Sequence, residues 1–357
     1  MAFQKIKNVK ISGMAACVPK NIVDNSTLEM IGTKQERSKF IDLTGIAKRH
    51  TVGNNKICTS DLCFQASERL VADLNWSKDE IDCLLFVSQT PDYMVPATSC
   101  ILQDRLGLST DCFALDISLG CSGWVYGLAT IAQLLSSGSF NKALLLVGDT
   151  VSVTKSSRDK GTFPLFGDAG TATALEYIQH ASPMFFHTGT DGSNHKAIII
   201  EDGGFRNFFT KDSLTVKESA PGVFRNNLQT HLNGTDVFIF GITKAPQSIK
   251  KLLQNFNIDR EDIDYYILHQ ANKLMNEKIR KKISAAVEKV PYSLDEYGNT
   301  SSATIPLTIV TRLNKEVRTS KQKIVCSGFG VGLSWGSVYF EIDKIVCPEI
   351  IIYNTNF

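Results

Sequence analysis

The sequence predicts an α/β protein built on a largely parallel sheet and on a duplicated β-α-β unit. Short apolar or β-branched runs alternate with longer amphipathic segments, as expected when strands and helices follow each other along a chain. Three sequence patterns of the first half also recur, in the same order, in the second half. The length of 357 residues suits two domains or one bilobal domain.

Nine segments account for the expected elements. Five short runs rich in Val, Ile and Leu predict strands at residues 9–12, 83–88, 143–148, 265–268 and 323–327. Four longer segments carry apolar side chains at helical spacing and predict helices at residues 60–74, 124–136, 244–255 and 274–287.

Two stretches lack such periodicity. Residues 187–235 are rich in Gly, Asn, Thr and Asp, which predicts a long connection that covers or lines a site. The tail, residues 344–357, is expected either to pack on the surface or to join a contact between subunits, and the sequence leaves both open.

The duplication rests on three pairs of segments. KDEIDCLLFVSQ resembles REDIDYYILHQ, KALLLVG resembles QKIVCSG, and GTATALEYI resembles GSVYFEI. Each match is weak alone, but their common order predicts two halves that meet near residue 180. We therefore expect an N-terminal half at residues 1–180 and a C-terminal half at residues 181–357.

Composition and charge exclude several classes of protein. Apolar residues make up 43% of the chain, and 38 Lys and Arg against 36 Asp and Glu leave a net charge of +2. So small a charge argues against a general nucleic-acid coat, and the apolar runs are too short for a membrane helix. The start, MAFQKIKNVK, lacks the apolar core of a signal peptide. We expect a cytoplasmic protein with neither nucleic acid nor membrane as a partner.

Nine cysteines, with no C-x2-C pair, favour reduced thiols over a disulfide framework or a zinc finger. Most of them lie in apolar runs and are expected to be buried. Cys121 differs, because it falls between Gly120 and Gly123 where a strand gives way to a helix. A thiol at a helix start is expected to favour the nucleophilic thiolate. The alternative, a structural buried cysteine, is less favoured because of the flanking glycines.

Two further polar residues are candidates for chemistry. His269 ends the expected strand in YYILHQANKL, at the edge where α/β proteins bind ligands. Asn299, in DEYGNTSSATIPL, is either a turn or capping residue or an amide donor at a loop tip. No second His, Cys or carboxylate lies at metal-binding spacing near His269, so no metal is expected.

The glycine-rich run CSGFGVGLSWGS, residues 326–337, is a weak phosphate signal, and its N–H groups equally suit an oxyanion site. The run also contains a G-x-S-x-G pattern around Ser334. A serine hydrolase needs a histidine after this serine, and none follows. We therefore set the hydrolase hypothesis aside.

Together, ALDISLGCSGWVYGL, LHQAN, GNTSSATIPL and GFGVGLSWGS resemble β-ketoacyl-acyl carrier protein synthase III, a condensing enzyme of the thiolase superfamily. The resemblance implies a thiolase-like duplicated five-layered α-β-α-β-α fold. It places the nucleophilic cysteine in the N-terminal half and the histidine and asparagine in the C-terminal half. It also implies no cofactor, an acyl-CoA or acyl-acyl carrier protein and malonyl-acyl carrier protein as substrates, and a homodimer in which residues 91–96 reach the partner's tunnel.

By this resemblance Cys121 accepts the acyl primer as a thioester. His269 and Asn299 bind the thioester carbonyl of the malonyl substrate and stabilise the enolate that forms when CO2 leaves. The backbone N–H groups of Cys121 and Val331 form the oxyanion hole. Members of the family usually have glycine where this chain has Val331, and the bulkier residue is expected to narrow the pocket.

The binding residues depart further from the family. Lys39 and Leu43 stand where coenzyme A-binding members have the tryptophan and arginine that hold adenine, and Lys160 replaces an arginine of the tunnel mouth. The primer is therefore expected on acyl carrier protein, or to be an unusual acyl group. The resemblance also assigns Gly234, Phe238 and Asn272 to substrate or carrier binding.

Residues 273–289 carry six Lys or Arg and two Glu, and such a charge run is often only a solvated helix face. Because carrier proteins are acidic, the segment is also a candidate dock. The candidates are Lys278, Arg280, Lys281 and Lys282.

The expected function is a decarboxylating condensation in fatty acid or related lipid or polyketide biosynthesis. The main alternative is acyl transfer to an alcohol or amine, in secondary metabolite or surface-glycan biosynthesis. A non-catalytic partner subunit is less favoured because Cys121 is present. Thiolase proper is less favoured because Ser334 stands where a second cysteine would be needed.

Overall fold

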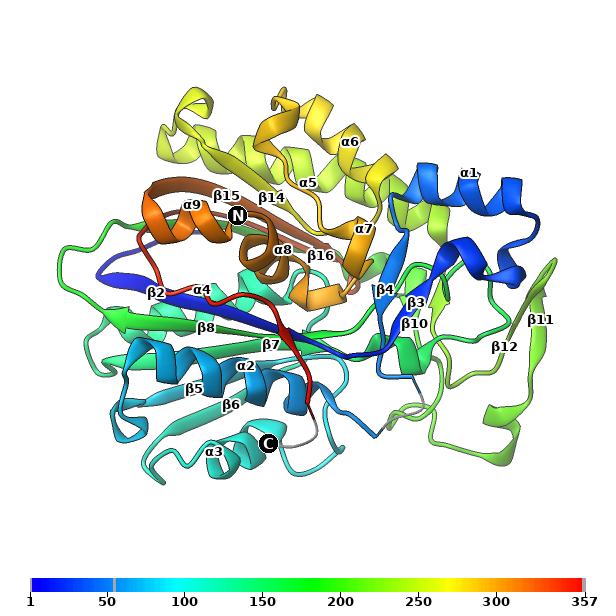
Figure 1. Cartoon of the computed structure of the whole chain (residues 1–357), viewed down its shortest axis with the longest axis horizontal. Coiled ribbons are helices and arrows are strands. Elements are labelled where there is room, and N and C mark those ends of the chain that lie inside the picture. Colours follow the sequence, from blue (N-terminus) through cyan, green and yellow to red (C-terminus); the bar gives the residue numbers. More distant parts are fainter. Residues whose placement is uncertain (1, 54–55, 355–357) are drawn as a thin grey trace.

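The computed structural model describes residues 2–53 and 56–354, and these form five layers. Two sheets lie on either side of a central layer that contains α4 (Gly123–Ser136) and α8 (Thr304–Arg312). Helix α2 (Thr59–Leu74) covers the outer face of the first sheet, and α5 (Gly234–Phe256) covers that of the second (Figure 1). The thiolase-like five-layered fold expected from the sequence is confirmed.

The first sheet has six strands and mixed directions. Neighbouring strands are antiparallel from β2 to β8 and from β8 to β7, and parallel in the other pairs. Their order across the sheet is β17 (Ile351–Ile352), β2 (Val9–Val18), β8 (Ala169–Tyr177), β7 (Lys142–Asp149), β5 (Cys83–Val87) and β6 (Phe113–Ile117).

The second sheet has five strands, and only its β14–β15 pair is parallel. Three of the five neighbouring pairs in the first sheet are parallel, so the expectation of a largely parallel sheet holds for that sheet and is wrong for the second. One reason is that β15 and β16 follow each other across a short turn with no crossover helix, which makes them antiparallel. The order is β1 (Ala2–Ile6), β9 (Met184–Thr190), β16 (Ser334–Asp343), β15 (Lys321–Gly330) and β14 (Tyr265–Leu268).

The duplication is confirmed strand by strand. The series β2-β8-β7-β5 and β9-β16-β15-β14 have the same order and the same alternation of antiparallel and parallel pairs. The three repeated sequence patterns fall on β5 and β14, on β7 and β15, and on β8 and β16. The ends of β5 and β14 thus occupy equivalent places, and each leads into the site described below.

The expected division at residue 180 stays a prediction. Residue 180 lies between β8 and β9, but one strand of each half pairs in the sheet of the other half. β1 pairs with β9 in the second sheet, and β17, in the tail, pairs with β2 in the first. The tail thus packs against its own chain as far as residue 354, while residues 355–357 lie outside the described part.

Helix boundaries differ from the expectation at two places. α5 begins ten residues before the predicted start, because Asn233 caps it by accepting from the N–H of Asp236. α6 (Lys273–Lys282) ends before the predicted residue 287. There the guanidinium of Arg280 donates to the carbonyl of Ala285 at 2.8 Å, and Ser284 has a positive φ of 56°. The remaining helices are α1 (Lys34–Thr44), α3 (Thr98–Arg105), α7 (Leu294–Tyr297) and α9 (Asn314–Thr319).

Close packing in the central layer fixes the start of α4. A Cβ on Gly127 would lie 2.8 Å from side-chain carbons of Leu145 and Val87, so glycine lets this helix approach the first sheet. Trp124 is fully buried one turn earlier and donates from Nε1 to Thr173 Oγ1 at 3.2 Å. The residues just before α4 are therefore held firmly at the sheet edge.

Residues 187–235 contain more structure than expected. They form two small antiparallel pairs, β10 (Ile198–Ile199) with β13 (His231–Leu232) and β11 (Lys217–Ala220) with β12 (Val223–Arg225). A further pair, β3 (Ile22–Asp24) with β4 (Lys48–His50), lies beside them on the same side of the molecule (Figure 1). In the described part of the chain no helix is long and apolar enough to cross a membrane.

Candidate active site

A cavity of about 340 Å³ opens where the two halves meet, and all three predicted catalytic residues line it. Cys121 comes from the turn before α4, His269 from the end of β14, and Asn299 from the loop before α8. The connection 187–235 closes one side of the cavity with Ile198–Ile199 and Thr230, which confirms its expected place over a site.

Glycines bring the turn at Cys121 against the β15–β16 turn. A Cβ on Gly330 would lie 2.7 Å from Cys121 Sγ, and one on Gly120 would lie 2.7 Å from Cγ1 of Val331. These distances leave no room for a side chain. The backbone of residues 330 and 331 therefore faces the sulfur directly.

The thiol of Cys121 is reached through the cavity and is otherwise enclosed by protein. Burial raises its pKa to about 11, while the backbone N–H of Val331 and the hydroxyl of Ser301 act in the opposite direction. Desolvation thus opposes the thiolate that the helix start is expected to favour, and it outweighs those donors. At neutral pH the resting side chain is a protonated thiol.

His269 is buried and held in a neutral state. Its Nδ1 lies 2.8 Å from Thr304 Oγ1, and its ring meets that of Phe329 edge-on at 5.5 Å. Burial lowers its pKa to about 3, and a hydrogen bond with the backbone of Ser301 only partly offsets this effect. A neutral imidazole can donate one hydrogen bond without bringing a charge into the cavity.

The loop around Asn299 is fixed by its backbone. Its N–H donates to the carbonyl of Leu165 at 2.9 Å, and its own carbonyl accepts from Gly167 at 3.1 Å. Its side-chain oxygen accepts from the N–H of Ser301 at 2.9 Å. Within residues 2–53 and 56–354 its side-chain nitrogen, Nδ2, has no hydrogen-bond partner. Both N–H groups of this nitrogen are therefore left for a ligand.

Sequence reasoning missed Asp149, a buried carboxylate that ties the site together. It accepts from the hydroxyl of Ser302 at 2.6 Å and from the backbone N–H of Gln89 at 2.7 Å. It therefore links the ends of β7 and β5 to the turn beside Asn299. Its only sequence signal was an aspartate at the end of the expected strand KALLLVGD.

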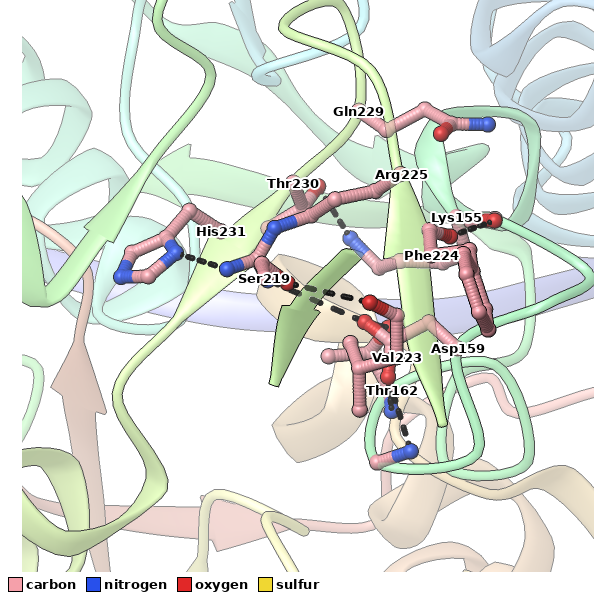
Figure 2. A network of polar contacts seen from close by, with 12 residues as sticks. Lys155, Asp159, Thr162, Ser219, Val223, Phe224, Arg225, Gln229, Thr230 and His231 are labelled. Atoms are coloured by element: carbon pink, nitrogen blue, oxygen red, sulfur yellow. Dashed lines mark hydrogen bonds and ion pairs between the residues drawn. The ribbon is translucent and has the colours of Figure 1, made fainter. Parts of the chain in front are cut away.

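Lys155 was also missed. It lines the cavity from the segment between β7 and β8, and Figure 2 shows its ammonium directed at Thr230. In the sequence VTKSSRDKG it looks like an ordinary loop lysine, and no local pattern predicts its burial.

The predicted binding residues do not line this cavity. Asn272 caps α6, with its side-chain oxygen 2.8 Å from the N–H of Met275, and Gly234 is the first residue of α5. Arg280 is paired with Glu277 at 2.8 Å, which neutralises part of its charge. The other five, away from the cavity wall, are Lys160, Phe238, Lys278, Lys281 and Lys282.

The glycine-rich run forms the end of β15, a turn and the start of β16, so it presents backbone N–H groups to the cavity and no helix start for a phosphate. Ser334 is buried, 2.7 Å from Ser122 Oγ, and donates to the carbonyl of Val331. It is therefore not a free nucleophile. Across residues 2–53 and 56–354, no group of three or more His, Cys, Asp or Glu side chains is placed to hold a metal ion.

Two family models match the segments of the chain that form this site. Residues 115–192 match the family model for 3-oxoacyl-[acyl-carrier-protein] synthase III, and residues 253–342 match the model for its C-terminal part. These two segments contain Cys121, His269 and Asn299.

Whole-chain relatives extend the match. A β-ketoacyl-[acyl-carrier-protein] synthase III of Streptococcus agalactiae is 33% identical, over 93% of this chain and 99% of its own. One from Rhodopirellula baltica is 32% identical, over 94% and 99%. The crystal structure of a 3-oxoacyl-(acyl-carrier protein) synthase from Burkholderia xenovorans is 34% identical with a TM-score of 0.92, and covers 99% of both chains. The chain thus belongs to the β-ketoacyl-[acyl-carrier-protein] synthase III family and is a condensing acyltransferase with the thiolase fold.

Proposed function

We propose that Cys121 carries the acyl primer as a thioester, and that His269 and Asn299 then promote its condensation with malonyl-acyl carrier protein. The observation that supports this most is the gathering of these three side chains, from both halves of the chain, around one enclosed cavity. The presence of the thiol argues against a non-catalytic subunit.

In the first step the sulfur of Cys121 attacks the thioester carbonyl of the donor. The carbon–sulfur bond to the donor breaks, the donor leaves as a thiol, and the proton of Cys121 passes to it. Negative charge develops on the carbonyl oxygen, and we assign its stabilisation to the backbone N–H groups of Cys121 and Val331. The backbone of residues 330 and 331 faces the sulfur at the cavity wall, which supports this place for the oxyanion hole.

In the second step the malonyl carboxylate leaves as CO2, and its electron pair forms the enolate of an acetyl thioester. We assign the single proton of neutral His269 to Nε2, with Nδ1 accepting from the hydroxyl of Thr304. This N–H and one N–H of Asn299 would stabilise the enolate oxygen in a cavity that excludes water. The carbanion then attacks the acyl carbon on Cys121. The bond to sulfur breaks, the thiolate takes up a proton, and a β-ketoacyl-carrier protein is released.

We propose acyl carrier protein as the docking partner and an exposed basic face of α6 as its dock. Lys278 and Lys281 are exposed there, whereas Arg280 is partly neutralised by Glu277. Replacing Lys278 and Lys281 by glutamate should raise the KM for the carrier protein and leave the reaction with a small pantetheine thioester unchanged. Unchanged kinetics with the carrier protein would contradict this dock.

We also propose a homodimer. Residues 91–96 contain exposed apolar side chains, with Val95 80% exposed, next to Gln89 and Thr90 in the cavity wall. Sedimentation of the native protein tests this, and a monomer at micromolar concentration would contradict it. No cofactor is proposed, since both steps use only the thioesters and these side chains. A cytoplasmic location stays a prediction.

The decisive experiment is intact mass measurement of the protein mixed with a panel of acyl-CoAs and acyl-carrier proteins, followed by malonyl-carrier protein. Acylation of Cys121 that discharges into a β-ketoacyl product is expected, and Cys121→Ala should abolish it. Discharge onto an alcohol or amine instead would favour the alternative acyltransferase. His269→Ala should still be acylated but should fail to condense.

A further inference from the structure

Lys155 is a buried cation in the cavity wall, and the mechanism above gives it no task. Lys155 is only 8% exposed, and it lines the same cavity as Cys121. Most of the wall on this side is apolar, and it includes Val151, Ile198, Ile199, Ile200 and Leu232. A charged group buried in such a wall costs free energy unless it is paired and hydrogen-bonded.

The ammonium is held in place by neutral groups. Its Nζ donates to Thr230 Oγ1 at 2.7 Å and to Thr154 Oγ1 at 3.1 Å, and it lies 4.3 Å from the ring centroid of Phe166. Figure 2 shows the first of these bonds reaching across from the segment between β7 and β8 to the connection 187–235. In the described part of the chain no carboxylate lies within 4 Å of this nitrogen.

The buried carboxylates nearby have donors of their own. Asp159 accepts from the hydroxyl of Thr162 at 2.8 Å and lies 3.9 Å from Arg225 (Figure 2). Asp168 accepts from the hydroxyl and N–H of Ser152, and Asp149 is held by Ser302 and Gln89 as described above. Among residues 2–53 and 56–354, Lys155 therefore has hydroxyl partners that orient it but no ion-pair partner.

Burial lowers the pKa of Lys155 to about 8, and the carboxylates of Asp149, Asp168 and Asp159 partly oppose this shift. At pH 7 most of the side chain is still protonated. An acyl group that consists only of CH2 and CH3 groups would offer this ammonium no acceptor. Such an acyl chain would also displace water from the cavity, and the ammonium would lose that solvation without gaining a partner.

We propose that Lys155 selects acyl primers that carry a carboxylate, by pairing with that carboxylate inside the cavity while the thioester lies at Cys121. The inference rests on the proposed function of Cys121 and adds the chemical class of the primer. A carboxylate supplies the missing counter-charge and accepts a charge-assisted hydrogen bond, while Thr154, Thr230 and Phe166 keep the ammonium in position.

The test compares two small donors of the same shape, glutaryl-pantetheine and 5-methylhexanoyl-pantetheine, in which an isopropyl group replaces the carboxylate. The rate of acylation of Cys121 is followed by intact mass. The native protein is expected to prefer the glutaryl donor, and Lys155→Met should reduce that preference about tenfold or more. Lys217→Met is the matched control, because Lys217 is exposed on β11 away from the cavity, and it should keep the native preference.

Several outcomes would overturn the role of Lys155. These are a native preference for the 5-methylhexanoyl donor, an equal preference in Lys155→Met and Lys217→Met, or a stronger preference for a neutral 6-hydroxyhexanoyl donor. If Lys155→Met does not fold, the native preference decides by itself. Failure of every donor, including the carrier-bound ones, to acylate Cys121 would instead contradict the proposed nucleophile.

Discussion

Replacing Gly330 by alanine should disable the nucleophile without disturbing the rest of the fold. The new Cβ would lie 2.6 Å from the Cβ of Cys121 and 2.7 Å from its Sγ. Carbon atoms pack best at about 3.5–4.0 Å, so one of the two segments must retreat by about 1 Å. A misplacement of about 1 Å in a reacting group can cost about 100-fold in rate, or about 3 kcal/mol of activation free energy.

The assay is the rate at which intact Gly330→Ala protein gains the mass of the acyl group. The expected result is a loss of about 100-fold relative to the native protein, with thermal unfolding nearly unchanged. Gly204→Ala is the matched control, because a Cβ at Gly204 meets nothing within 4 Å. Acylation of Gly330→Ala at the native rate would refute the argument that Cys121 is held by the close approach of Gly330.

Three further predictions address the site and the core. Asn299→Ala should slow condensation about 10²–10³-fold, because it removes a donor to the enolate. Mass measurement should find the acylation of Cys121 little changed. An equal loss of rate in both steps would contradict the role of Asn299. The alkylation rate of Cys121 by iodoacetamide, followed by peptide mapping, should still rise between pH 9 and 10, because its pKa is raised to about 11 and the thiolate is scarce below that pH. A plateau reached below pH 9 would mean that the helix start does lower this pKa. Phe186→Ala, at a fully buried position between the sheets, should reduce the free energy of unfolding in urea by about 3–5 kcal/mol, whereas Phe205→Ala, at an 87% exposed position, should change it by less than about 0.5 kcal/mol.

The repeated patterns and the catalytic residues were predictable because their signals are local. β14 spans the predicted residues 265–268, since an apolar run bounded by charges defines a buried strand. His269 follows this strand, Cys121 lies between an expected strand and an expected helix, and Asn299 lies in a loop just before a helix. The backbone alone therefore brings them to one place once the strand order is given.

What the sequence did not reveal depends on contacts between distant segments. The burial of Lys155 comes from Thr230, 75 residues away in a connection without periodicity. The raised pKa of Cys121 comes from the enclosure of the sulfur, which no pattern around residue 121 encodes. The antiparallel strands were missed for a similar reason, because direction in a sheet depends on how a connection crosses it and not on the strand's own residues.

The exchange of edge strands between the halves has a consequence for synthesis on the ribosome. β1 is made before its partner β9, which begins at residue 184, so β1 waits for about 180 residues of translation. At about 5–20 residues per second this delay is on the order of 10 to 40 seconds. During that time β1 has no strand with which to form its native hydrogen bonds. The first sheet in turn receives β17 long after its other strands, the last of which ends at Tyr177. The second sheet can therefore be completed while its own half is made, whereas the edge of β2 in the first sheet stays unpaired until β17 follows.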